Sequence, residues 1–129
     1  MNFSNRIWQP TNFYGNWEIG EGTSIGAFCD IGGKIGKDCK IQTHVSIPPG
    51  VTIKDNVFIG PGVRFCNDPK MDGRLRETLV KSGAKIGAGA IIGAALIIGK
   101  NSVIGMGSVV THDVGDNEVW YGNPARKIK

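Results

Sequence analysis

Apolar residues recur at every sixth position along most of this chain of 129 residues. They form three runs that each keep phase: Ile19, Ile25 and Ile31; Ile35, Ile41, Ile47, Ile53, Ile59 and Phe65; and Val80, Ile86, Ile92, Ile98, Ile104 and Val110. A period of six is a multiple of the two-residue strand repeat and fits no helical repeat, so these side chains point to one side of short strands. Glycine often follows the apolar residue. The pattern predicts an all-β fold, a parallel β-solenoid of stacked hexapeptides around one apolar column.

The repeat breaks in two places. Between Ile31 and Ile35 the spacing falls to four residues, which predicts a tightened corner. After Phe65, residues 66–79 leave the repeat and carry more charge than the coils around them. A solenoid accepts an insertion that leaves at a corner, and such loops often carry function, although a loop that is only solvated is the alternative. We expect one domain over 1–129, with coils at about 7–65 and 80–110, an extruded loop at 66–79 and a C-terminal tail at 111–129.

Composition narrows the class of protein. Cys29 and Cys39 stand at the small inward position of their hexads, which favours buried free thiols and a reducing cytoplasm. The segment MNFSNRIWQP lacks the apolar core of a signal peptide, and the most apolar stretch, 88–99, is shorter than the roughly 20 residues of a membrane span. The net charge of +4 favours an anionic ligand. Without a concentrated basic stripe, neither nucleic acid nor a membrane is an expected partner.

Several short segments resemble a known family. They are FCND at 65–68, TLVKSGA at 78–84, GSVVT at 107–111 and GNPAR at 122–126. Together with the hexads, they resemble the hexapeptide-repeat acyltransferase superfamily, and KIQTHVSI at 40–47 is similar to a rung of its bacterial nucleotide-linked amino-sugar N-acetyltransferases. The resemblance implies a left-handed parallel β-helix, a triangular prism with three hexads per coil. It also implies an N-acetyltransferase that uses acetyl-CoA and no metal, as a homotrimer with the coenzyme between adjacent prisms.

The loop opening carries the candidate catalytic residues. Relatives that acetylate hydroxyl groups use a loop histidine as the base, whereas this loop opens with Asn67 and Asp68 and contains no histidine. A sugar amine can arrive partly unprotonated near neutral pH, so the loss matters less for an amine. The resemblance makes Asn67 a residue that positions the amine or the thioester, because an amide has no useful basicity. Asp68 either takes the proton of the amine or only caps the turn before Pro69.

The chain has two histidines. His44 lies at a bend, and the matching positions of later coils are Gly62, Gly89 and Gly107, so an exposed imidazole on a prism edge is expected. It is either a surface residue or a general base that acts with a neighbouring subunit. His112 follows the segment Val-Val-Thr, and it is either a coenzyme contact or a residue of the loop surface.

The same resemblance assigns the coenzyme contacts. Coenzyme A is expected along the backbone of Ala88 and Met106, with Thr111 and Arg126 near its phosphates, since a guanidinium suits a phosphate. The pair Trp120–Tyr121 stands where smaller residues are usual, and it would narrow the coenzyme channel or cap the last coil.

The sequence also bears on three other functions. An O-acetyltransferase of a sugar or serine hydroxyl uses the same scaffold, but the loop without histidine argues against it. A zinc hydratase needs three histidine ligands at each metal, and the chain has two histidines in all. A non-catalytic hexapeptide scaffold stays open, because a fold does not define an activity.

Overall fold

The computed structural model describes residues 5–129, and its regular elements are short β-strands; no helix occurs among these residues. The strands are β1 (Arg6–Ile7), β2 (Asn12–Phe13), β3 (Glu18–Ile19), β4 (Ser24–Ile25), β5 (Asp30–Ile31), β6 (Lys34–Ile35), β7 (Lys40–Ile41), β8 (Ser46–Ile47), β9 (Val51–Ile53), β10 (Phe58–Ile59), β11 (Arg64–Phe65), β12 (Thr78–Val80), β13 (Lys85–Ile86), β14 (Ile91–Ile92), β15 (Ile97–Ile98), β16 (Val103–Ile104), β17 (Val109–Val110), β18 (Val119–Gly122) and β19 (Ala125–Lys127). Most hexads therefore supply one strand, as the period predicts.

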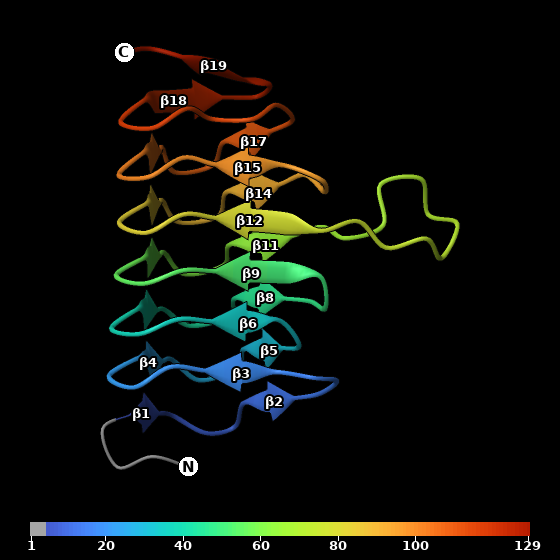
Figure 1. Cartoon of the computed structure of the whole chain (residues 1–129), viewed down its shortest axis with the longest axis vertical. Helices are drawn as coiled ribbons and strands as arrows, with labels where there is room; N and C mark the ends of the chain where they lie inside the picture. Colours follow the sequence, from blue (N-terminus) through green and yellow to red (C-terminus); the bar gives the residue numbers. More distant parts are fainter. Residues whose placement is uncertain (1–4) are drawn as a thin grey trace.

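The strands form three sheets, which are the faces of a prism. Sheet A has the order β1-β4-β7-β10-β13-β16-β18-β19, sheet B the order β17-β14-β11-β8-β5-β2, and sheet C the order β15-β12-β9-β6-β3. All neighbours pair in parallel except β18 and β19. The coils stack along the long axis, with β1 at one end of the stack and β19 at the other (Figure 1). Together with the hexapeptide repeats, this stacking confirms the predicted left-handed β-helix.

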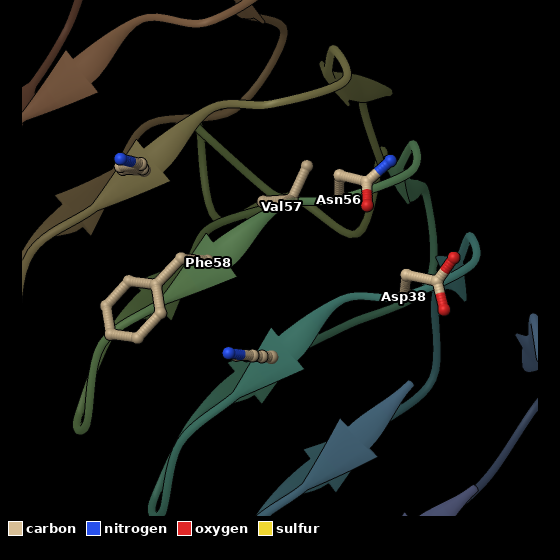
Figure 2. Close-up of a pocket in the computed structure, with 6 residues that line it drawn as sticks. Asp38, Asn56, Val57 and Phe58 are labelled. Atoms are coloured by element: carbon tan, nitrogen blue, oxygen red, sulfur yellow. The ribbon is translucent and has the colours of Figure 1, made fainter. Parts of the chain in front are cut away.

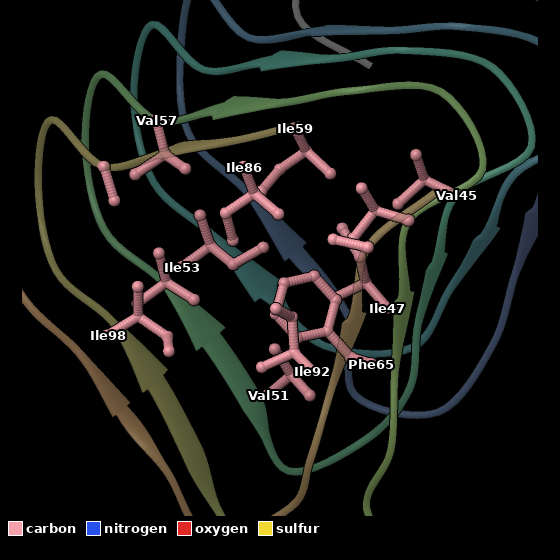
Figure 3. Packing of buried hydrophobic residues seen from close by; sticks show 14 of the residues in the cluster. Val45, Ile47, Val51, Ile53, Val57, Ile59, Phe65, Ile86, Ile92 and Ile98 are labelled. Atoms are coloured by element: carbon pink, nitrogen blue, oxygen red, sulfur yellow. The ribbon is translucent and has the colours of Figure 1, made fainter. Parts of the chain in front are cut away.

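The interior is a continuous apolar column. Ile41, Ile59, Ile86 and Ile104 lie in register on successive strands of sheet A, and each is at most 1% exposed. Figure 3 shows Ile59 and Ile86 with other inward side chains, such as Ile53, Ile92 and Ile98, inside the prism. Burying one such side chain stabilises the fold by roughly 1.5–3 kcal/mol relative to leaving it exposed. No single two-residue strand could bury its apolar face alone, so the coils are stable only as a stack.

Two cysteines belong to this column. Cys29 is 2% exposed and Cys39 is fully buried, and both are free thiols. The Cys29 thiol donates to the carbonyl of Gln42 at 3.1 Å, and the Cys39 thiol donates to the carbonyl of Lys54 at 3.0 Å. Burial raises the pKa of both thiols, because the interior disfavours the thiolate. The prediction of buried thiols is confirmed.

The short hexad makes a tight corner, as predicted. Only Gly32 and Gly33 separate β5 from β6, and both donate their N–H groups to the carbonyl of Ile47, at 2.7 and 3.0 Å. A Cβ on Gly33 would stand 2.5 Å from the carbonyl oxygen of Val51. This close approach of two backbones requires glycine at residue 33.

The corners of the prism are named here by the sheets that they join: the AB corner, the BC corner and the CA corner. The extruded loop leaves at the BC corner, between β11 and β12, and projects away from the stack (Figure 1). It spans residues 66–77 and not 66–79, because β12 begins at Thr78. Thr78 pairs with Val51 and donates its N–H to the carbonyl of Gly50 at 3.0 Å. Residues 78 and 79, which the sequence placed in the loop, therefore belong to sheet C.

The C-terminal segment is not the tail that the sequence predicted. Thr111 to Val114 form one more turn, with Val114 bridged to Ile98 of sheet C. Strand β18 then adds in parallel to β16, and β19 folds back on β18 as an antiparallel hairpin. Trp120 lies in register with Ile104 and packs against the core, so the hairpin covers the otherwise open end of the apolar column.

No helix within the described part of the chain is long and apolar enough to cross a membrane.

Candidate active site

His44 lies at the AB corner, in line with Gly62, Gly89 and Gly107 of the later coils, as the sequence predicted. The N–H groups of Gly62, Gly89 and Gly107 donate to the carbonyls of the coil before, at 2.8–2.9 Å, and the His44 N–H does the same at 3.2 Å. All four residues have left-handed backbones, with φ between 60° and 74°. The His44 side chain is exposed, as expected for a prism edge.

The AB corner also contains two contacts that sequence reasoning missed. The His44 ring stacks on the exposed ring of Phe28, with centroids 5.2 Å apart and an angle of 27° between the planes. The Arg64 guanidinium, which lies on sheet B, donates to the His44 carbonyl at 2.9 Å. A signal for the stacked pair did exist, because Phe28 occupies the position of His44 one coil earlier once the short hexad is counted.

Ala88 and Met106 lie at the same corner, on consecutive coils. The Ala88 carbonyl accepts the Gly107 N–H at 2.8 Å, and the Met106 side chain is 81% exposed. Tyr121, from β18, covers Gly105 beside Met106, so a Cβ on Gly105 would overlap its ring. The structure thus divides the pair Trp120–Tyr121: Trp120 caps the core, and Tyr121 borders the upper end of the AB corner.

Asn67 fixes the neck of the loop at the BC corner. Its side-chain Nδ2 donates to the Pro49 carbonyl at 2.8 Å, and its own carbonyl accepts the Arg76 N–H at 2.7 Å. One residue therefore joins the outgoing and returning strands of the loop to the coil below. The Asn67 side chain is only partly exposed, so its orientation is defined by the fold.

Asp68 points into the loop itself. Its Oδ1 accepts the Asp72 N–H at 3.0 Å and its Oδ2 accepts the Gly73 N–H at 2.8 Å. The carboxylate therefore accepts hydrogen bonds from the turn that follows Pro69, and not from a turn before it, while proton transfer by Asp68 stays a prediction. Below the neck, a hollow of about 350 Å³ at the BC corner is lined by residues that include Gly50 and Glu77.

The residues expected at the phosphates of the coenzyme lie apart. Thr111 and His112 follow β17 at the BC corner, where the Thr111 hydroxyl lies 3.1 Å from Nδ1 of His112 and both residues are exposed. Arg126 is exposed on β19, and one guanidinium nitrogen donates to the Ala125 carbonyl at 3.0 Å. The predicted site residues thus divide between two corners: His44, Ala88 and Met106 at the AB corner, and Asn67, Asp68, Thr111 and His112 at the BC corner.

A further hollow of about 450 Å³ lies on the outer face of sheet A (Figure 2). Phe58 stands in it in register between Lys40 and Lys85 of the neighbouring strands. The two lysines occupy the positions on both sides of the ring. Among residues 5–129, no group of three or more His, Cys, Asp and Glu side chains is arranged to hold a metal ion.

The chain belongs to the bacterial transferase hexapeptide family, whose six-repeat model matches residues 32–67 and 77–112. The unmatched gap between these ranges falls inside the extruded loop. No curated protein matches the chain.

Several solved structures have the same fold as this chain. One is a variant of perosamine N-acetyltransferase from Caulobacter crescentus in complex with CoA and GDP-perosamine, with a TM-score of 0.86 and 23% identity over 97% of this chain. A second is WeeI from Acinetobacter baumannii AYE, with a TM-score of 0.81 and 31% identity over 93% of this chain. This chain spans 56% of the length of each of them. A third is a variant of AntD, an N-acyltransferase from Bacillus cereus with dTDP and coenzyme A, with a TM-score of 0.87 and 23% identity over 95% of this chain and 78% of that one.

Proposed function

We propose that this protein is an acetyl-CoA-dependent N-acetyltransferase that acts on the amino group of a nucleotide-linked amino sugar. The observation that carries the proposal is the anchored Asn67 at the neck of a loop that contains no histidine. Similar structures hold CoA together with GDP-perosamine or dTDP, which supports the two substrate classes. Three free cysteines suit a reducing cytoplasm as the site of action.

Asn67 has a defined chemical role in this proposal. Because its Nδ2 is held by the Pro49 carbonyl at 2.8 Å, the amide plane is fixed and Oδ1 can accept an N–H of the incoming amine. The amine nitrogen attacks the thioester carbonyl carbon, the carbon–sulfur bond breaks, and coenzyme A leaves as the thiolate. The amine proton passes to water or to the leaving thiolate. Positioning of this kind lowers the barrier without a side-chain base.

In the proposed enzyme, the coenzyme contacts come from two copies of the chain. Ala88 and Met106 would border the pantetheine arm at the AB corner, whereas Thr111 and His112 lie at the BC corner. A homotrimer about a threefold axis would bring the AB corner of one copy to the BC corner of the next, since a head-to-tail interface closes into a ring. Arg126 would then bind the phosphate end of the coenzyme as a fork of donors. In this arrangement His44 of one copy faces the loop of its neighbour.

The test is release of free thiol from acetyl-CoA with a panel of nucleotide-linked 3-amino and 4-amino sugars. We expect thiol release with at least one amino sugar and an amide in the product by mass spectrometry. The matched controls are the same nucleotide sugars with a hydroxyl group in place of the amine. Faster acetylation of the hydroxyl compounds would contradict the N-acetyltransferase assignment, and thiol release with none of the compounds would support the non-catalytic scaffold.

A further inference from the structure

The stacked pair at the AB corner has one open face. Phe28 and His44 occupy the same position on successive coils, and their rings stack with centroids 5.2 Å apart. The next coil has Gly62 at this position, so it contributes no side chain above the His44 ring. A Cβ on Gly62 would meet only the backbone of Gly89, at 3.9 and 4.0 Å, among residues 5–129 apart from its chain neighbours. Position 62 therefore leaves the place of a third stacked side chain unfilled.

The spacing of this vacancy fits an aromatic ring. Neighbouring strands of a sheet lie about 4.8 Å apart, which is close to the separation of stacked aromatic rings. A flat ring placed over His44 at the height of Gly62 would extend the ladder that Phe28 begins. The His44 ring is held in place, because Phe28 stacks on its opposite face.

A cation lies beside the same position. The Arg64 guanidinium donates to the carbonyl of His44 at 2.9 Å, so it is held at the edge of the stacked pair while its other N–H groups stay exposed. A guanidinium with free donors suits a phosphate oxygen. An open aromatic face next to a fixed guanidinium matches the two parts of a nucleotide, a base and its phosphates.

We propose that the Phe28–His44 pair and Arg64 form a nucleotide subsite, in which a nucleobase stacks on His44 over Gly62 and Arg64 binds the adjoining phosphate. The proposal deepens the proposed function, on which it rests for the biological ligand, and it gives His44 a role in binding and not in proton transfer. The base comes either from the nucleotide-linked sugar or from the adenine of coenzyme A, and the experiment distinguishes these two sources.

The Phe58 surface of sheet A provides the contrast. Phe58 is also an exposed ring with cations close by, but Lys40 and Lys85 take up the positions on both sides of it. Lysine side chains therefore stand at both register positions beside Phe58, whereas the position beside His44 on the next coil is Gly62. Phe58→Ala removes an exposed aromatic ring from a basic surface without touching the proposed subsite, so it is the matched control.

The test measures binding of UDP, dTDP, GDP and CoA by isothermal titration calorimetry, in the wild-type protein and in His44→Ala, His44→Phe, Gly62→Asn, Arg64→Ala and Phe58→Ala. Asn tolerates a left-handed backbone, so Gly62→Asn fills the vacancy with little strain at φ +74°. We expect His44→Ala and Gly62→Asn to weaken binding of at least one ligand by about 5- to 100-fold, the range of base–aromatic stacking. His44→Phe and Phe58→Ala should change it by less than about threefold, and Arg64→Ala should weaken it.

The pattern across ligands identifies the source of the base. Weakened binding of a nucleoside diphosphate with CoA unchanged assigns the subsite to the sugar nucleotide, and the reverse assigns it to the coenzyme. The proposal is overturned if no ligand binds the wild-type protein, if His44→Ala leaves all four affinities unchanged, or if His44→Phe or Phe58→Ala weakens binding as much as His44→Ala. Thiol release is measured separately. If the wild-type enzyme is active but His44→Ala does not change nucleotide binding, only the subsite is contradicted. If the protein binds nucleotides through His44 but releases no thiol, only the N-acetyltransferase function is contradicted.

Discussion

At the scale of single residues, Asn67 joins the fold to the proposed chemistry, because the hydrogen bond from Nδ2 to the Pro49 carbonyl fixes the amide at the neck of the loop. Asn67→Ala removes the group that accepts the amine, so we expect kcat to fall by about 10–1,000-fold. Affinity for CoA should change by less than about threefold, since the proposed contacts of CoA are Ala88, Met106, Thr111, His112 and Arg126 and not Asn67. Steady-state kinetics and CoA titration measure the two quantities.

Arg126→Ala is the reciprocal control, and it should weaken CoA binding with a smaller effect on kcat. Equal losses of CoA affinity in both variants would contradict the division of roles between Asn67 and Arg126.

Thr78 carries a hydroxyl that the fold does not use. The residue is 1% exposed, and Oγ1 has no hydrogen-bond partner within the described chain. An unsatisfied buried hydroxyl costs about 1–3 kcal/mol, so Thr78→Val should stabilise the fold and raise the melting temperature by about 3 °C or more. Thr23→Val is the matched change at a satisfied site, because its hydroxyl donates to the Gly36 carbonyl at 2.7 Å. Thermal unfolding should show opposite shifts, and a lowered melting temperature for Thr78→Val would show that its hydroxyl has a partner.

At the scale of strands, the six-residue period determines which side chains point into the core. Ile97 and Ile98 are neighbours on β15, yet Ile98 is fully buried and Ile97 is 44% exposed. Ile98→Ala should cost about 2–5 kcal/mol and lower the melting temperature by about 10 °C, whereas Ile97→Ala should shift it by less than about 3 °C. Because a slip of one residue exchanges the two faces of a strand, a larger loss for Ile97→Ala would contradict the register.

The Glu118 carboxylate contacts both strands of the β18–β19 hairpin. Glu118 accepts hydrogen bonds from Trp120 Nε1 at 3.1 Å and from the Gly115 N–H at 2.6 Å, and it lies 3.1 Å from Lys127 Nζ. The bond from Trp120, then that from Gly115, lowers the pKa of Glu118 below its ordinary value of 4.5. A lowered pKa in the folded state means that these contacts stabilise the hairpin above pH 4.5 and are lost as the pH falls through the folded value.

We therefore expect the NMR signals of the Trp120 indole N–H and the Gly115 amide to shift together below pH 4.5. In Glu118→Gln, which keeps an acceptor oxygen without the charge, both signals should stay constant over that range. If the two signals shift with pH in Glu118→Gln as they do in the wild type, a group other than Glu118 causes the transition.

The period of six predicted the parallel solenoid, its inward residues and the break at the extruded loop, because each inward isoleucine repeats the same local geometry, and the family resemblance implied the prism. The pairing of Trp120 with Ile104 was not predictable in this way, since the hairpin lies outside the repeat. The stack of Phe28 on His44 was hidden by the short hexad, which reduces the spacing of these residues below a full coil. The hydrogen bonds from Asp72 and Gly73 to Asp68 depend on the path of an irregular loop. Because the loop has no repeating pattern, its path could not be predicted from the sequence.

At the scale of the whole molecule, the proposed function combines residues of two corners, which one copy of the chain holds apart and a neighbouring copy would bring together. Sheet B joins the AB corner to the BC corner. Its outward residues are polar in the first four coils and apolar in the last two, where they are Ile91 and Val109. Ile91 is 41% exposed in the single chain, so burying it between copies would be favourable. We therefore infer that the upper part of sheet B faces the threefold axis.

We expect light scattering to give three times the chain mass of 13.8 kDa at micromolar concentration. Ile91→Lys places a charge in the inferred interface, so the trimer should dissociate and acetyl transfer should fall at least about 100-fold, because each site would lose half of its residues. Ile97→Lys makes the same change on sheet C, at a side chain of nearly equal exposure, 44% against 41%, and should leave both the mass and the activity close to wild type. An active wild-type monomer would rule out a shared site. If Ile97→Lys dissociates the trimer and Ile91→Lys does not, then sheet C, and not sheet B, faces the axis.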